Sequence, residues 1–171
     1  PLPLITEFLA RNQGGLTDED GAASDWIEIH NPGAAPIALG GYHLTDRKSK
    51  PTRWTFPAET ALPAGAYLVV FASGKDRAVA GKPLHTNFSL SSGDACSRRG
   101  AYLALTDKGG APLPPEYDTY PAQPLATSYG LMEPSTAAPR AFFAEPTPGA
   151  ANQAGAALPE RVTFTPPSRT F

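Results

Sequence analysis

The sequence predicts an all-β fold in which short strands form a β-sandwich. Glycine (16) and proline (20) make up about a fifth of the 171 residues, against a usual share of about 12%. They are spread between short apolar runs, where they mark turns and leave little room for long helices. Apolar residues within the runs recur with a period close to two, as in strands with one buried face. The length suits one well-buried domain with additional loops or tails.

The segment 25–30 shows the alternation most clearly. Ile27 and Ile29 share one face. The opposite face carries Trp26, Glu28 and His30. This pattern predicts a strand whose isoleucine face lies in the core and whose other face is half exposed.

Two further strands stand out. The continuous apolar run 67–72 predicts a strand covered on both faces, at the middle of the core. The run 102–106 alternates and is followed by a turn at 107–110, which is rich in Asp and Gly and sends the chain back. Shorter strands are expected at 37–39, 42–45, 53–56, 116–120 and 127–130.

Two proline-rich segments are expected to be loops. Segment 112–124 contains five prolines, which remove backbone donors and leave room only for a brief edge strand. The same reasoning applies to 132–148. These segments extend the sandwich to about 150 residues, beyond the roughly 100 of a typical immunoglobulin domain.

Charge and cysteine content exclude several classes of protein. The formal net charge is −2, and the Lys and Arg residues are scattered, so nonspecific nucleic-acid binding has no electrostatic support. The single cysteine, Cys96, cannot form an intramolecular disulfide or a cysteine-based zinc site. No apolar run approaches the roughly 20 residues that cross a bilayer, so membrane insertion is not expected. The first residues do not form a signal peptide, and the signal of an exported protein would lie outside this sequence.

A series of motifs runs along the chain from about residue 5 to 152. They are ITEF at 5–8, DEDG at 18–21, SDWIE at 24–28, LGGY at 39–42, LPAG at 62–65, HTNFSL at 85–90, YLAL at 102–105, SYG at 128–130 and PTPGAAN at 146–152. Together they resemble the lamin-tail domain family, in its bacterial form. Their order and spacing carry the resemblance, which implies an immunoglobulin-like β-sandwich without shared catalytic residues. The segment 94–99 departs from the family pattern by lengthening a turn, which makes Cys96 a loop thiol.

The resemblance also implies a place in a larger protein. Related bacterial domains occur in exported multidomain proteins, so we expect an extracellular or cell-surface location. We expect a lamin-tail domain at 1–152, and a linker with the start of a following domain at 153–171. The expected function is that of a non-catalytic interaction or structural module, which binds a protein partner or positions neighbouring domains. The alternative is a calcium- or carbohydrate-binding β-sandwich.

The acidic residues Asp18, Asp20 and Asp25 are the candidate metal ligands, for calcium only. Hard cations bind several carboxylate and carbonyl oxygens of a flexible loop. The spacing does not fit an EF-hand, because aligning Gly21 with its conserved glycine places Leu16 and Ile27 where oxygen ligands are needed. The competing interpretation is that these aspartates cap turns and accept backbone N–H groups.

No catalytic residue and no cofactor other than this possible calcium are expected. The histidines His30, His43 and His85 lack the spacing of known metal or hydrolytic motifs, and only proximity in the fold could bring them to carboxylates. A further hypothesis is that exposed aromatic rings form a platform for binding sugars. The competing interpretation is that the same rings fill the core. The aromatic residues concerned are Trp26, Trp54, Tyr42 and Tyr67.

Overall fold

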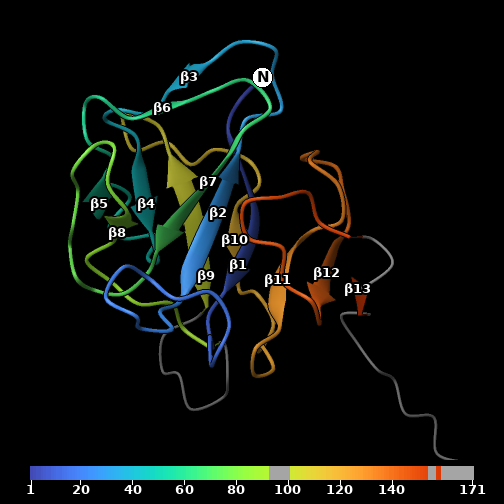
Figure 1. Cartoon of the computed structure of the whole chain (residues 1–171). Helices are drawn as coiled ribbons and strands as arrows, with labels where there is room; N and C mark the ends of the chain where they lie inside the picture. Colours follow the sequence, from blue (N-terminus) through green and yellow to red (C-terminus); the bar gives the residue numbers. More distant parts are fainter. Residues whose placement is uncertain (93–100, 154–156, 159–171) are drawn as a thin grey trace, which may run out of the picture.

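Two sheets enclose one hydrophobic core in this computed structural model, which describes residues 1–92, 101–153 and 157–158 (Figure 1). The larger sheet has seven strands in the order β13-β12-β11-β1-β2-β7-β8. All of its pairings are antiparallel except that of β7 with β8. Its strands are β1 (Leu4–Leu9), β2 (Trp26–His30), β7 (Tyr67–Phe71), β8 (Leu84–His85), β11 (Ser128–Leu131), β12 (Arg140–Phe143) and β13 (Ala157–Leu158).

The smaller sheet packs across the core from β1 and β2. Its order is β10-β9-β4-β5, and a separate pair joins β3 to β6. The bounds are β3 (Ile37–Ala38), β4 (His43–Thr45), β5 (Trp54–Thr55), β6 (Ala61–Leu62), β9 (Tyr102–Thr106) and β10 (Tyr117–Asp118). The described residues include no helix, and hence none that could cross a bilayer.

The core joins both sheets through aliphatic and aromatic side chains. Ile27 and Ile29 of β2 are fully buried, as the alternation predicts. Phe8 of β1 packs edge-on against Tyr117 of the smaller sheet, with ring centroids 5.0 Å apart. The Tyr117 hydroxyl donates a hydrogen bond of 2.9 Å to the carbonyl of Ile5, so a buried polar group also links the two sheets.

A β-bulge at Thr6 sets the faces of β1. Ile5 pairs with Ile29 and Glu7 pairs with Glu28, which leaves Thr6 as the extra residue. Regular alternation would place Ile5 and Phe8 on opposite faces. The bulge restores both to the core, where each is buried.

Several predictions are confirmed. The all-β sandwich is present, with strands at Trp26–His30, Tyr67–Phe71 and Tyr102–Thr106. The turn after Thr106 closes with a hydrogen bond of 2.9 Å from Gly110 N–H to the Asp107 carbonyl. The proline-rich segment 112–124 holds the two-residue edge strand β10.

Three other predictions are wrong. Segment 132–148 contains more than a loop with a brief edge strand, because the four-residue strand β12 pairs with β11 on one side and with β13 on the other. Strand β7 lies next to the edge of its sheet, where its first three residues are only half buried. The face of β2 that carries Trp26, Glu28 and His30 is buried rather than half exposed. A later segment of the chain covers this face.

Residues 157–158 of the expected linker pair with β12. Cys96 and residues 159–171 lie outside the described part of the chain.

Candidate functional site

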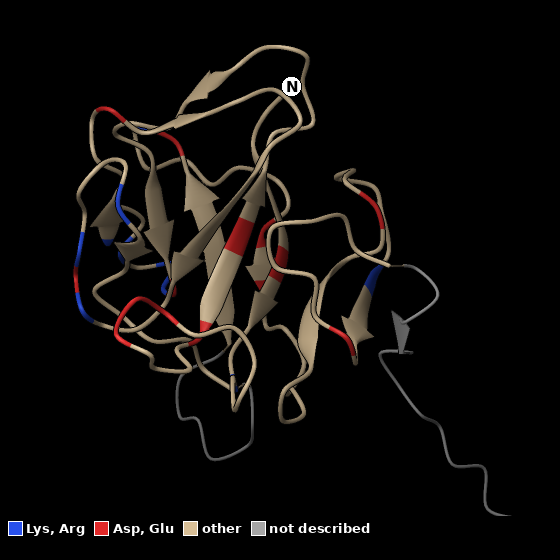
Figure 2. Ribbon diagram, in the orientation of Figure 1, with Lys and Arg blue, Asp and Glu red and all other residues tan. Residues whose placement is uncertain are grey.

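Two glutamates lie opposite each other on the outer face of the larger sheet. Glu7 on β1 is the cross-strand partner of Glu28 on β2, and both are 0% exposed. Figure 2 shows them as neighbouring red segments of the two strands. Like charges at opposed positions repel, and burial adds a desolvation cost to each ionised carboxylate. Both carboxylates therefore need hydrogen-bond donors close by.

Residues 145–152, here named the strap, supply most of these donors. The backbone N–H of Thr147 lies 3.2 Å from both carboxylate oxygens of Glu7. The backbone N–H of Gly149 donates to Glu28 Oε2 at 2.7 Å. The strap therefore crosses the sheet directly over the acid pair, as the red-orange segment after β12 does in Figure 1.

Hydroxyl groups of the sheet donate further hydrogen bonds to the acid pair. Ser128 on β11 donates to Glu7 Oε1, and Thr6 donates to Glu28 Oε1 at 2.6 Å. The bulged residue is thus a direct partner of the acid on the neighbouring strand.

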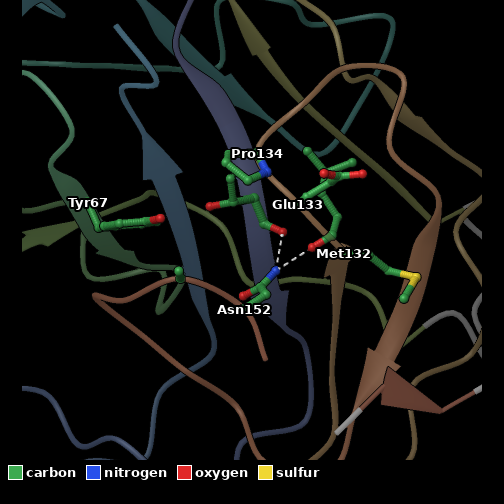
Figure 3. Close-up of a pocket in the computed structure, with 8 residues that line it drawn as sticks. Tyr67, Met132, Glu133, Pro134 and Asn152 are labelled. Atoms are coloured by element: carbon green, nitrogen blue, oxygen red, sulfur yellow. Dashed lines mark hydrogen bonds between the residues drawn. The ribbon is translucent and has the colours of Figure 1, made fainter. Parts of the chain in front are cut away.

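Asn152 fastens the end of the strap to the sheet. Its Nδ2 donates to the carbonyls of Leu131, at 2.6 Å, and of Thr6, at 3.2 Å (Figure 3). Its Oδ1 lies 3.0 Å from Thr147 Oγ1, which also lies 3.1 Å from Glu7 Oε2. One hydroxyl carries one proton, so Thr147 can donate to only one of these acceptors. A proton on Glu7 would satisfy both contacts, with Glu7 donating to Thr147 and Thr147 donating to Asn152.

Burial favours the protonated form of the acid pair. It raises the pKa of Glu28 from 4.5 to about 7, against the opposing effect of the hydrogen bonds from Thr6 and Gly149. The neighbouring Glu7 raises the pKa of Glu28 further. Burial also raises the pKa of Glu7, although Ser128 and Thr147 oppose it. The pair therefore holds protons at a pH where exposed glutamates are ionised.

Two hollows border the strap. The smaller, of about 140 Å³, lies at its end, between Tyr67, Met132, Pro134 and Asn152 (Figure 3). The larger, of about 260 Å³, lies at its beginning, and we name it the groove. Apolar residues dominate the groove. They are Leu9, Leu16, Trp26, Ala126, Pro146 and Pro148.

The acidic loop at 18–20 forms ion pairs with the connection between β7 and β8. Asp18, whose side chain is fully buried, accepts the Ser24 hydroxyl at 2.7 Å and the Lys75 ammonium at 2.6 Å. Burial opposes ionisation of Asp18, but these hydrogen bonds outweigh it and hold its pKa well below the ordinary value. Asp20 pairs with Lys75 at 2.7 Å and with Arg77 at 2.8 Å. This loop is therefore tied down by cations of the chain itself.

His85 joins the same cluster from β8. Its Nε2 lies 2.8 Å from Glu19, and its Nδ1 lies 2.8 Å from the Ser73 hydroxyl. The fold thus brings one histidine to a carboxylate and a serine, which the sequence did not indicate. The imidazole is fully buried, and both of its nitrogens are engaged, so it braces the acidic loop against β7 and β8.

The three predicted calcium ligands do not contact the same partners. Asp18 and Asp20 both contact Lys75, whereas Asp25 accepts the backbone N–H of Asn12 at 3.3 Å. Burial raises the pKa of Asp25 to about 6. Among the described residues, no group of three or more His, Cys, Asp or Glu side chains is placed to hold a metal ion. Calcium binding stays a prediction.

The other candidate histidines and aromatic residues do not lie together in one site. The His30 ring stacks on Tyr67 with centroids 4.1 Å apart, and His43 Nδ1 lies 2.8 Å from the Thr55 hydroxyl. Trp26 and Trp54 are both buried, so neither ring is presented to solvent as a sugar platform.

Residues 4–113, well over half of the chain, match the family model of the lamin tail domain. The chain belongs to this family. Comparison with curated proteins and with solved structures gives no match. The matched segment contains the acid pair and the acidic loop of this lamin tail domain, but it ends before the strap.

Sequence reasoning missed the acid pair, although each part of it lay in a motif. Glu7 lies in ITEF, Glu28 in SDWIE, and Thr147 and Gly149 in PTPGAAN. The available signal was that two acids and a proline- and glycine-rich turn belong to the same series of motifs in this sequence. The opposed position of Glu7 and Glu28 could not be predicted without the bulge, because simple alternation places Glu7 on the same face as Ile5.

Replacing Asn152 with alanine should destabilise the lamin tail domain by about 1–3 kcal/mol, because the buried carbonyls of Thr6 and Leu131 lose a donor. Urea denaturation measures the change. The neighbouring exposed Gln153→Ala is the control and should leave the free energy of unfolding nearly unchanged. Equal effects of the two substitutions would contradict the fastening role of Asn152.

Glu28→Gln should flatten the dependence of stability on pH between about 4.5 and 7. The folded-state pKa of Glu28 is about 7, above its ordinary value of 4.5, so the folded chain holds a proton that the unfolded chain has lost. The free energy of unfolding of the unsubstituted domain should therefore fall as pH rises through this window, by on the order of 3 kcal/mol. Urea denaturation across this range measures the slope.

The exposed Glu59→Gln serves as the control for this pH profile and should keep the original slope. Asp25 and Glu7 contribute to the slope in the same direction and are present in all three proteins. Because Glu7 and Glu28 interact, the difference in slope reports Glu28 together with its coupling to Glu7. An unchanged slope in Glu28→Gln would contradict the raised pKa.

The calcium prediction requires the metal to displace Lys75 from Asp18 and Asp20. It predicts that the melting temperature rises by several degrees in excess calcium over EDTA, because a ligand of the folded state stabilises it. The double variant Asp18→Ala with Asp20→Ala should abolish this rise. Superimposable melts of the unsubstituted domain would contradict the prediction.

Proposed function

We propose that this lamin tail domain is a non-catalytic module of an exported multidomain bacterial protein, located outside the cell or at its surface. In this role it binds a protein partner or positions neighbouring domains of its own chain. Its family of immunoglobulin-like domains is generally involved in protein interactions, which supports the proposal. The groove beside the strap is the observation that carries it.

The groove has the character of a site for an apolar side chain. Its volume of about 260 Å³ accommodates one large side chain, and its floor includes the buried Trp26. Leu16 on its rim is 37% exposed, and Leu125, next to the lining residue Ala126, is 48% exposed. Exposed aliphatic residues around an apolar hollow are typical of a surface that a protein partner covers.

The arrangement of His85 supports a non-catalytic role. A hydrolytic serine needs a base that can take its proton and a substrate that can reach both groups. The His85 ring is fully buried, and Glu19 is itself paired with Arg77 at 2.6 Å. Stabilisation of the acidic loop accounts for these contacts.

Photo-crosslinking in cells that make the full-length protein tests the proposal. A photoreactive p-benzoyl-phenylalanine in place of Leu16 or Leu125 should give an adduct with one defined polypeptide or with another domain of the same chain. The matched control is Val79, which is 61% exposed and lies outside the groove lining. It should give no such adduct.

The crosslinked partner, once purified, provides the quantitative measurement. Leu16→Asp should weaken its binding at least about tenfold, because a carboxylate would enter an apolar contact. Val79→Asp should leave the affinity unchanged. Adducts formed equally from Val79, or an affinity that Leu16→Asp does not change, would overturn the proposal.

A further inference from the structure

A third hollow, of about 570 Å³, opens on the connection between β4 and β5. Although basic residues are scattered over the whole chain, four of them fall within 47–53. Figure 2 shows blue segments beside β4 and β5. The residues that line the hollow include three cations and three neutral polar side chains, and no acid. They are Arg47, Ser49, Lys50, Thr52, Arg53 and Asn87.

The charges at this hollow are only partly neutralised. Arg53 pairs with Asp46, and Lys48, outside the lining, pairs with Asp118. Within the described residues, no ion pair or side-chain hydrogen bond engages the guanidinium of Arg47 or the ammonium of Lys50. The Nε of Arg47 is buried and finds no hydrogen-bond partner in the described part of the chain. The unpaired charges of Arg47 and Lys50 therefore line a hollow in which an anionic ligand would accept charge-assisted hydrogen bonds.

The loop is held in place before any ligand arrives. The buried Thr45 hydroxyl lies 2.9 Å from the Arg47 carbonyl and 2.7 Å from the Lys50 carbonyl. The Lys50 N–H donates to the Arg47 carbonyl at 3.0 Å. Thr106 of β9 donates to the Pro51 carbonyl at 2.8 Å. A loop fixed in this way loses little conformational entropy on binding.

We propose that this hollow binds a tetrahedral oxyanion, namely the phosphate or sulfate group of a ligand. Arg47 and Lys50 supply the unneutralised positive charge, and the hydroxyls of Ser49 and Thr52 line the same hollow. A guanidinium donates two parallel hydrogen bonds to phosphate-like groups. Donors from several residues match an anion with three or four oxygens better than a carboxylate with two. The site is independent of the groove and of the function proposed above.

Titration of the isotopically labelled protein, followed by backbone amide NMR, tests the site. Inorganic phosphate, inorganic sulfate and the monoester O-phosphoserine are added at constant ionic strength, with chloride as the balancing ion, so that screening does not change. Saturable shifts should be confined to residues 45–53 and 87. Tighter binding of the ester than of inorganic phosphate would identify an esterified group as the source, and the reverse order would identify the free ion.

Variants then distinguish specific binding at this hollow from nonspecific electrostatic attraction. Arg47→Gln with Lys50→Gln should weaken binding at least about tenfold, since two charged donors are lost. Lys82→Gln with Lys108→Gln removes the same charge elsewhere and should bind like the unsubstituted protein. Arg47→Lys keeps the charge but loses the planar fork, and should give an intermediate affinity.

The proposal is overturned if the unsubstituted protein gives no saturable shift with any of the three anions. It is equally overturned if the control pair weakens binding as much as the Arg47 and Lys50 pair. The first outcome does not depend on whether any variant folds.

Discussion

The buried pair of Glu7 and Glu28 is the constraint on which the outer face of the larger sheet depends. Pairing of β1 with β2 places the two carboxylates opposite each other, which is unfavourable while they lack donors. Their donors on the strap lie 140 and 121 residues further along the chain. The carboxylates on β1 and β2 therefore depend on hydrogen-bond donors from residues 145–152. The strap is part of the fold and not a tail that follows it.

The bulge at Thr6 connects this constraint to the core. It lets Ile5 and Phe8 face inward while Glu7 faces the strap. The same residue donates its hydroxyl to Glu28 and offers its carbonyl to Asn152. Gly130 on β11 allows the close approach that this requires, because a Cβ there would lie 2.1 Å from the Thr6 carbonyl oxygen. One irregular position thus serves the core, the acid pair and the strap together.

The sequence predicts the inner face of the sandwich better than its outer face. Alternation identifies the isoleucine face of β2, because apolar residues there have no competing explanation. It cannot distinguish a polar face in water from one that a distant segment covers, so Glu28 and His30 were expected to be half exposed. β12 was missed because the prolines around it outweighed Ala141, Phe142 and Phe143. The ion pair of Asp18 was beyond prediction, since it depends on the position of Lys75 in the fold.

The two proposed surfaces rest on different physical forces and on different sheets. The groove, formed by β1, β2 and the strap, offers apolar burial, whereas the hollow beside β4 and β5 offers cationic donors. With a net charge of −2, the molecule does not attract anions at long range. Selectivity at the hollow must therefore come from short-range hydrogen bonds of Arg47 and Lys50. Such bonds act well within the Debye length of about 8 Å at physiological salt, so they depend little on the net charge of the molecule.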